Sequence, residues 1–141
     1  MKVVPWFSID GYRVVTERGR GGDCHVSATV TAYIGPECTE REASGVGPVH
    51  ALDRALRACL RDAWPGLDAV RLADYDVSVV DAARGTASPV RVVITFADAA
   101  GRWDAGYVSD NIIDASMEAL CAATIIGIMR LPSDVGEVVV G

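Results

Sequence analysis

The chain has 141 residues, half of them hydrophobic and 23% charged, and it carries a formal net charge of −6 at pH 7. This length and apolar content can fill the core of one folded domain and exclude a disordered chain. The negative charge argues against nucleic acid and an anionic membrane as partners, because both attract a basic surface. We therefore expect a small-molecule ligand.

The N-terminus and the most apolar stretch indicate a cytoplasmic protein. Residues 1–10 contain no long apolar run and no small-residue cleavage site, which argues against a secretory signal. The uncharged run at residues 119–129 is far shorter than the roughly 18 to 20 residues that span a bilayer. We expect this run to lie in a core or an interface, not in a membrane.

The cysteines and histidines indicate neither a disulfide nor a metal centre. The four cysteines, at positions 24, 38, 59 and 121, form no Cys-x-x-Cys pair and are expected to be free thiols in a reducing cytosol. Cys24 and His25 are adjacent, but the further spaced ligands of a zinc site are missing from the sequence. We predict no metal and no cofactor.

The first half of the chain predicts three strands followed by a helix. A strand at residues 11–17 is followed by a longer one at 26–34, and residues 37–43 can return antiparallel. A helix from Pro48 to about residue 63 comes next, and Trp64-Pro65-Gly66 ends it. The longer strand alternates between an apolar face and a polar face. The apolar face comprises Val26, Ala28, Val30, Ala32 and Ile34, and the polar face Ser27, Thr29, Thr31 and Tyr33.

The second half repeats this pattern. Strands are predicted at residues 75–80, 90–96 and 102–108. Ser109 is then expected to cap a second helix, with Asp110 at its positive end.

The repetition predicts an α+β fold made of two tandem βββα units. The units occupy about residues 7–66 and 71–130 of a single domain, each with an antiparallel sheet covered by its helix, and residues 131–141 form a C-terminal tail. Strands joined by hairpins lack the βαβ crossovers of a dinucleotide-binding fold, so Gly45-Val46-Gly47 is not a nucleotide fingerprint.

The second helix is apolar on every side beyond its first turns. No charged residue occurs between Glu118 and Arg130, whereas an exposed helix normally keeps one polar face. One sheet cannot bury all sides of a helix. We therefore predict that part of this helix meets a second copy of the chain in a homodimer.

The junction before the first helix has two interpretations. Gly45 and Gly47 allow the backbone to approach a guest closely, and the N–H groups of the helix start suit a carboxylate. The plainer interpretation is a tight turn from strand to helix, with Pro48 setting the first helical turn. The residues of the junction by themselves favour the plainer one.

Several motifs follow one another at a characteristic spacing over about residues 7–128. The central motif is Gly45-Val-Gly-Pro-Val-His-Ala-Leu-Asp-Arg-Ala-Leu-Arg57, and the second helix start carries Val108-Ser-Asp-Asn-Ile-Ile-Asp-Ala-Ser-Met-Glu-Ala-Leu120. Further stretches are residues 7–14, 72–77, 85–86 and Trp103. Together they resemble the C-terminal regulatory, or dimerisation, domain of 2-isopropylmalate and citramalate synthases, and the resemblance is closer to the citramalate branch.

This resemblance implies a dimeric domain that binds leucine or isoleucine as a feedback effector near the two helix starts, at the subunit interface. The catalytic barrel of those synthases has no counterpart in the sequence, so we expect a stand-alone module whose partner is a separately encoded synthase subunit. The effector positions carried over by the match are Gly45, Gly47, Pro48, Val49, Ala51, Ser109, Ile112, Ile113 and Ala115.

Three residues depart from the family pattern at this site: Val46, His50 and Tyr107. We include Tyr107 among the effector-binding residues. The departures leave two alternatives to a binding module. One is an enzyme that reuses the pocket, with His50 as general base and Tyr107 as donor to an oxyanion. The other is a dimerisation piece whose pocket no longer binds a ligand.

Overall fold

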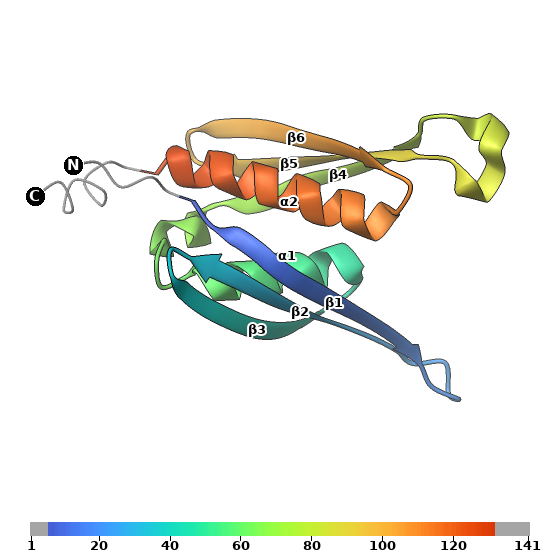
Figure 1. Cartoon of the computed structure of the whole chain (residues 1–141), viewed down its shortest axis with the longest axis horizontal. Coiled ribbons are helices and arrows are strands. Elements are labelled where there is room, and N and C mark those ends of the chain that lie inside the picture. Colours follow the sequence, from blue (N-terminus) through green and yellow to red (C-terminus); the bar gives the residue numbers. More distant parts are fainter. Residues whose placement is uncertain (1–5, 132–141) are drawn as a thin grey trace, which may run out of the picture. The chain divides into compact units, whose positions relative to one another are not determined.

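The structure is a computed structural model that describes residues 6–131, and it confirms the predicted α+β fold of two βββα units. The chain divides into Trp6–Pro65 and residues 66–131, which we call the first and the second unit. Each unit contains a three-stranded antiparallel sheet, with its strands in chain order, and one long α-helix (Figure 1). Of the predicted C-terminal tail, residues 132–141 lie outside the described residues.

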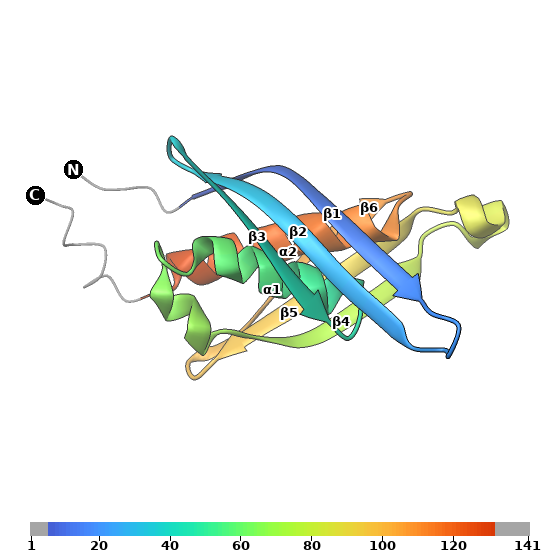
Figure 2. The same ribbon diagram turned by 90° about the horizontal axis from the view of Figure 1, so that it is seen from below.

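The sheet of the first unit consists of β1 (Ser8–Arg18), β2 (Cys24–Ile34) and β3 (Glu37–Gly45), which lie side by side in this order (Figure 2). The predicted alternation of β2 is confirmed, because the side chains of its apolar face are buried up to Ala32 and Ile34 is half-buried. β1 begins earlier than residue 11, since its pairing with β2 continues through a register shift between Ile9 and Gly11.

Helix α1, Pro48–Leu60, packs on β2 and β3 with one apolar face. It ends before the predicted residue 63, because the N–H groups of Ala63 and Trp64 both bind the carbonyl of Leu60 and close the helix. Pro65 follows at once, and the residue before a proline disfavours helical backbone. The fully buried face of α1 consists of Ala51, Leu52, Ala55, Leu56 and Leu60.

The outer face of α1 carries polar and charged side chains, and one of them, Asp53, is buried. Its carboxylate accepts a 2.9 Å hydrogen bond from Nε of Arg57, and only 8% of Asp53 is exposed. The arginine can reach over the helix and cover the carboxylate, since residues four apart lie on one side of a helix. His50, Arg54 and Arg61 are exposed.

The second unit pairs β4 (Arg71–Val79), β5 (Val90–Asp98) and β6 (Gly101–Ser109) antiparallel. Two 3₁₀-helices, η1 (Pro65–Ala69) and η2 (Ala82–Ala87), were not predicted. η2 projects from the end of the sheet between β4 and β5 (Figure 1). Asp81 caps it by accepting from the N–H of Ala83, and Gly85 has a φ of 64°. A left-handed backbone of this kind is readily adopted only by glycine.

Helix α2 runs from Ile112 to Met129, and its predicted cap is wrong. Ser109 still pairs with Val90 as the last residue of β6, and its Oγ accepts from the N–H of Asn111. The cap is Asn111, whose Oδ1 accepts a 3.0 Å hydrogen bond from the N–H of Asp114. The negative charge in the first turn therefore comes from Asp114.

Helix α2 packs on β5 and β6. Its Ser116 is hydrogen-bonded to Tyr75 of β4, and the indole of Trp103 donates to the carbonyl of Ala123. By length and composition this 18-residue helix could cross a bilayer. The prediction considered only the uncharged run at residues 119–129 and therefore underestimated the length of the apolar segment. Half of it is buried inside the structure, which is how a core helix packs.

Candidate ligand-binding site

The start of α1 lies directly against the end of β3. A Cβ on Gly45 would come within 2.5 Å of the backbone nitrogen of Ala51, so only glycine fits this position. Gly45 does not have a positive φ. Glycine is therefore required here because a side chain has no space, and not because of the backbone conformation. A Cβ on Gly47 would meet nothing within 4 Å. The two glycines therefore differ: the first is required for packing, and the second borders open space.

The helix start leaves backbone donors available to a ligand. Gly47 is the N-cap and provides no side chain, and the first helical hydrogen bond runs from the N–H of Ala51 to its carbonyl at 3.0 Å. Pro48 has no N–H, so the N–H groups of Val49 and His50 precede that first bond and have no carbonyl of their own helix to bind. The first turn of α1 contains no acidic residue. The positive end of this helix is therefore not compensated by its own side chains.

Two side chains of α1 hold the turn in place. Nδ1 of His50 accepts a 2.9 Å hydrogen bond from the N–H of Val46, and Nη1 of Arg54 donates to the carbonyl of Ser44 at 2.8 Å. An imidazole that accepts at Nδ1 carries its proton at Nε2 when neutral. Nδ1 is therefore already occupied, which argues against His50 as a general base through that nitrogen. The side chain of Val46 is 91% exposed.

At the start of α2, side chains of the chain itself cap the helix and compensate its positive end. Asn111 and Asp114 supply the cap and the negative charge that α1 lacks. Of the predicted effector residues here, Ile112 is 42% exposed and Ile113 is half-buried, whereas Ala115 is fully buried. The start of α1 therefore offers more to a carboxylate than the start of α2.

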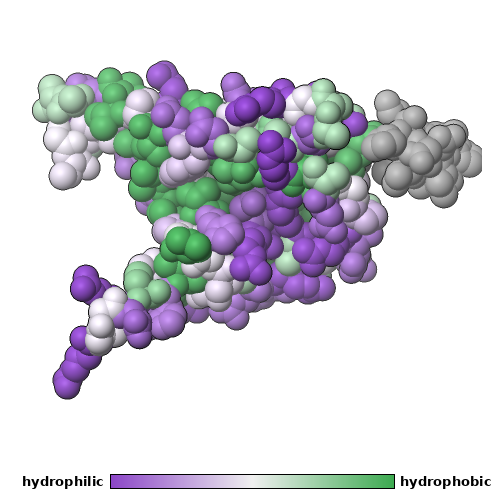
Figure 3. All heavy atoms as spheres, turned by 180° about the vertical axis from the view of Figure 1, so that it is seen from behind, coloured by the Kyte–Doolittle hydropathy of each residue, from purple (hydrophilic) through white to green (hydrophobic). Residues whose placement is uncertain are grey.

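Tyr107 lies on β6, directly opposite Val92 of β5. Partners in an antiparallel pair share one face of the sheet, so Tyr107 lies on the face that α2 covers. It is 45% exposed, like other large apolar side chains near this end of the unit. Figure 3 shows apolar side chains gathered toward the end of the second unit from which η2 projects. The exposed apolar residues include Tyr75, Val79, Val80, Tyr107 and Ile112.

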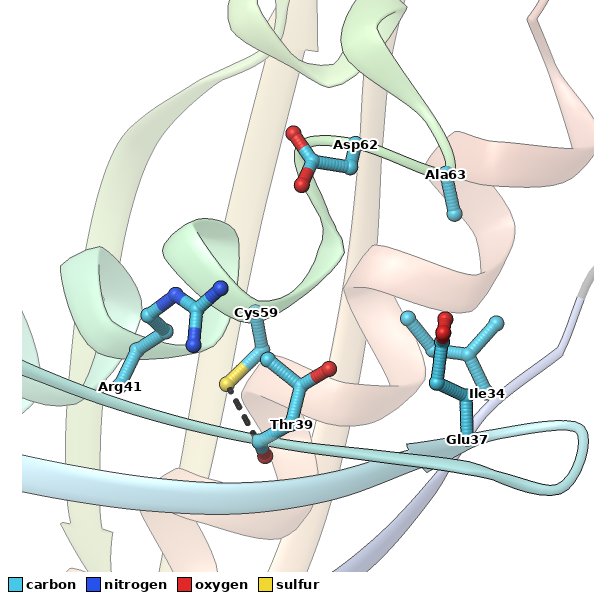
Figure 4. A pocket seen from close by; sticks show the side chains of 7 residues that line it. All are labelled: Ile34, Glu37, Thr39, Arg41, Cys59, Asp62 and Ala63. Atoms are coloured by element: carbon cyan, nitrogen blue, oxygen red, sulfur yellow. Dashed lines mark hydrogen bonds between the residues drawn. The ribbon is translucent and has the colours of Figure 1, made fainter.

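A hollow at the other end of α1 was missed by the sequence analysis. It has a volume of about 180 Å³ and lies within the first unit, between β3 and the residues that follow α1 (Figure 4). None of the predicted effector residues lines it. Its lining comprises Ile34, Glu37, Thr39, Arg41, Cys59, Asp62 and Ala63. The signal was the alternation of Glu37, Thr39 and Arg41 along β3, which places all three on the α1 side.

The cysteines show no catalytic arrangement. The buried thiol of Cys59 donates to the carbonyl of Val30 at 3.3 Å, and burial raises its pKa, an effect that Arg41 partly offsets. Burial also raises the pKa of the Cys121 thiol to about 12, with a smaller contribution from Glu118. Both thiols are therefore protonated and weakly reactive at neutral pH. Within residues 6–131, no group of three or more Cys, His, Asp or Glu side chains is placed to hold a metal ion.

Two βββα units joined in tandem form the architecture expected for the regulatory domains that the sequence motifs resemble. The family described as the LeuA allosteric (dimerisation) domain matches residues 4–125, and the chain belongs to this family. Its relatives include the (R)-citramalate synthase of Geobacter sulfurreducens, 43% identical over 82% of the chain. Those of Streptomyces coelicolor and Aquifex aeolicus are 37% and 35% identical over 89% and 91% of the chain. The chain spans only 22% to 24% of the length of these relatives.

Proposed function

We propose that this chain is a cytoplasmic regulatory and dimerisation module of citramalate synthesis that binds a branched-chain amino acid or a related small carboxylate. The family match over residues 4–125 is the observation that carries this proposal. The proposed partner is the catalytic part of a citramalate synthase, either in the same chain or encoded separately. The ligand would relay its presence to that partner through the dimer.

The start of α1 is the proposed site for the ligand carboxylate. The N–H groups of Val49 and His50, the absence of an acidic residue in the first turn, and the bare N-cap Gly47 support this choice. His50 contributes by holding Val46 and thereby the shape of the turn. Ile112 and Ile113, at the start of α2, stay proposed effector-binding residues of the second unit, where they offer aliphatic surface.

Calorimetric titration of the chain with leucine, isoleucine, valine and their 2-keto acids should give saturable heat with at least one of them. We expect His50→Ala to weaken that binding about threefold to tenfold, because the Val46 N–H loses its acceptor and the turn loosens. Arg61→Gln, at the exposed C-cap that follows α1, serves as the control and should bind as the unaltered chain does. The absence of heat with every ligand would contradict the binding function.

We further propose that the outer face of α2 forms the homodimer interface. On this face Ile125 is half-buried and Met129 is 68% exposed, on a helix without a charged residue between Glu118 and Arg130. Such a stripe is unusual for a helix facing water.

Light scattering at micromolar concentration should therefore report a dimer, and Ile125→Glu should shift it toward the monomer by placing a charge in an apolar contact. Val108→Glu is the matched control, because Val108 is an exposed valine in β6, outside α2. A monomeric unaltered chain, or equal effects of the two substitutions, would overturn this interface.

A further inference from the structure

The hollow at the C-terminal end of α1 has a different chemistry from the helix start. One guanidinium group, that of Arg41, and two carboxylates, those of Glu37 and Asp62, border it. In Figure 4 the Asp62 carboxylate is turned toward the Arg41 side, while Glu37 stands with Ile34 on the other side of Thr39. No ion pair joins Arg41 to either carboxylate in the part of the chain that the structure describes. Opposite charges thus border one hollow without neutralising each other.

The floor of the hollow is uncharged and partly apolar. Cys59 is 3% exposed, and its Sγ lies 3.9 Å from the carbonyl oxygen of Thr39 (Figure 4). Ile34 and Ala63 add aliphatic surface. Arg41 donates one hydrogen bond, from Nη1 to the carbonyl of Glu40 at 2.9 Å, which leaves other guanidinium donors for a guest.

The size of the hollow sets the size of its guest. Its volume is about 180 Å³. A buried apolar cavity of roughly 150 Å³ in another protein admits benzene. A molecule with between six and nine heavy atoms, by that rough comparison, matches the space in this more open hollow.

We propose that this hollow binds a small zwitterionic amino acid, with its carboxylate facing Arg41, its ammonium group facing Asp62, and a short aliphatic side chain over Cys59, while Glu37 borders the opposite side. The C-terminal end of α1 adds negative partial charge next to the ammonium group. The site is distinct from the start of α1 and does not depend on the function proposed above.

The net charge of the rim gives this site a different ligand preference from that of the helix start. Two carboxylates and one guanidinium leave one negative charge, so a ligand without an ammonium group meets net repulsion. A helix start, in contrast, binds a carboxylate whether or not an ammonium group accompanies it. An amino acid and its matching 2-keto acid therefore distinguish the two sites.

The test is an NMR titration of the whole isotope-labelled chain with three probes: L-valine, 3-methyl-2-oxobutanoate and isobutylamine. Valine should shift the amide signals of Thr39 and Cys59 with millimolar half-saturation, because exposed ion pairs contribute little each. The amine should bind at least threefold more weakly than valine, and the keto acid should leave these two signals unchanged. Shifts at Val49 and His50 report the helix start separately, so failure of either site is recognised independently.

Arg41→Gln and Asp62→Asn should each weaken valine binding at this hollow about threefold, and together about tenfold. Glu40→Gln is the matched control, because alternation along β3 places Glu40 on the face of the sheet away from α1. The proposal is overturned if the keto acid shifts Thr39 and Cys59 as valine does. It is equally overturned if valine causes no shift there, or if the double substitution leaves the affinity unchanged.

Discussion

Replacing Trp103 with alanine should destabilise the second unit by about 3–5 kcal/mol, the usual cost of removing a large buried aromatic side chain. Trp103 is 9% exposed, packs edge to face on Phe96, and donates from Nε1 to the carbonyl of Ala123 at 2.9 Å. The guanidinium of Arg130 lies 4.4 Å from the centre of its ring. One side chain thus joins the sheet, the middle of α2 and the end of α2.

Urea unfolding followed by circular dichroism, at equal protein concentrations, measures this cost. Trp6→Ala is the matched control, because Trp6 is 65% exposed and its removal should change the free energy of unfolding by about 0.5 kcal/mol or less. Trp103→Phe keeps a ring for Phe96 and Arg130 but loses the indole donor, so an intermediate cost of about 1–3 kcal/mol is expected. Equal costs for Trp103→Ala and Trp6→Ala would show that this contact does not hold the unit together.

Elements with one buried face could be predicted from the sequence, because burial imposes a period on the chain. The alternation along residues 26–34 predicted β2 correctly, and the helical spacing of apolar residues predicted α1. The end of an element is set more locally. Ser109, Asp110 and Asn111 are all good cap residues; the pairing of Ser109 with Val90 keeps Ser109 in β6, and the cap is Asn111.

The candidate site was less predictable, because its details depend on side-chain direction and not on periodicity. The sequence indicates that glycine is needed near residue 45, but not that the ring of His50 turns back to accept from Val46. The hollow near Cys59 gave no apolar signal, since Glu37 and Arg41 are charged although they lie on the α1 side of β3. Polar residues on that side do not stand out in a hydrophobic pattern.

The second large effect is expected from Gly45→Ala, which should destabilise the first unit. Gly47→Ala should have little effect. A methyl group on Gly45 would lie 2.5 Å from the nitrogen and 2.9 Å from the Cα of Ala51, and backbone atoms cannot rotate away as a flexible side chain can. The end of β3 and the start of α1 must then separate, at a cost of about 1–3 kcal/mol or somewhat more. The same separation displaces the N–H groups of Val49 and His50, so ligand binding at the helix start should weaken at least tenfold.

Gly47 is the internal control for this experiment, because it lies two residues away and differs only in its surroundings. Its φ of −144° suits any residue, and a Cβ there would meet nothing within 4 Å. Alanine is a poorer N-cap than glycine, so a loss of about 1 kcal/mol or less is expected. Urea unfolding and calorimetric titration of both variants measure the two effects together. If Gly45→Ala proves as stable as Gly47→Ala, the close contact between β3 and α1 is wrong. If Gly45→Ala unfolds more easily than the unaltered chain but binds the ligand with the same affinity, the ligand does not use this helix start.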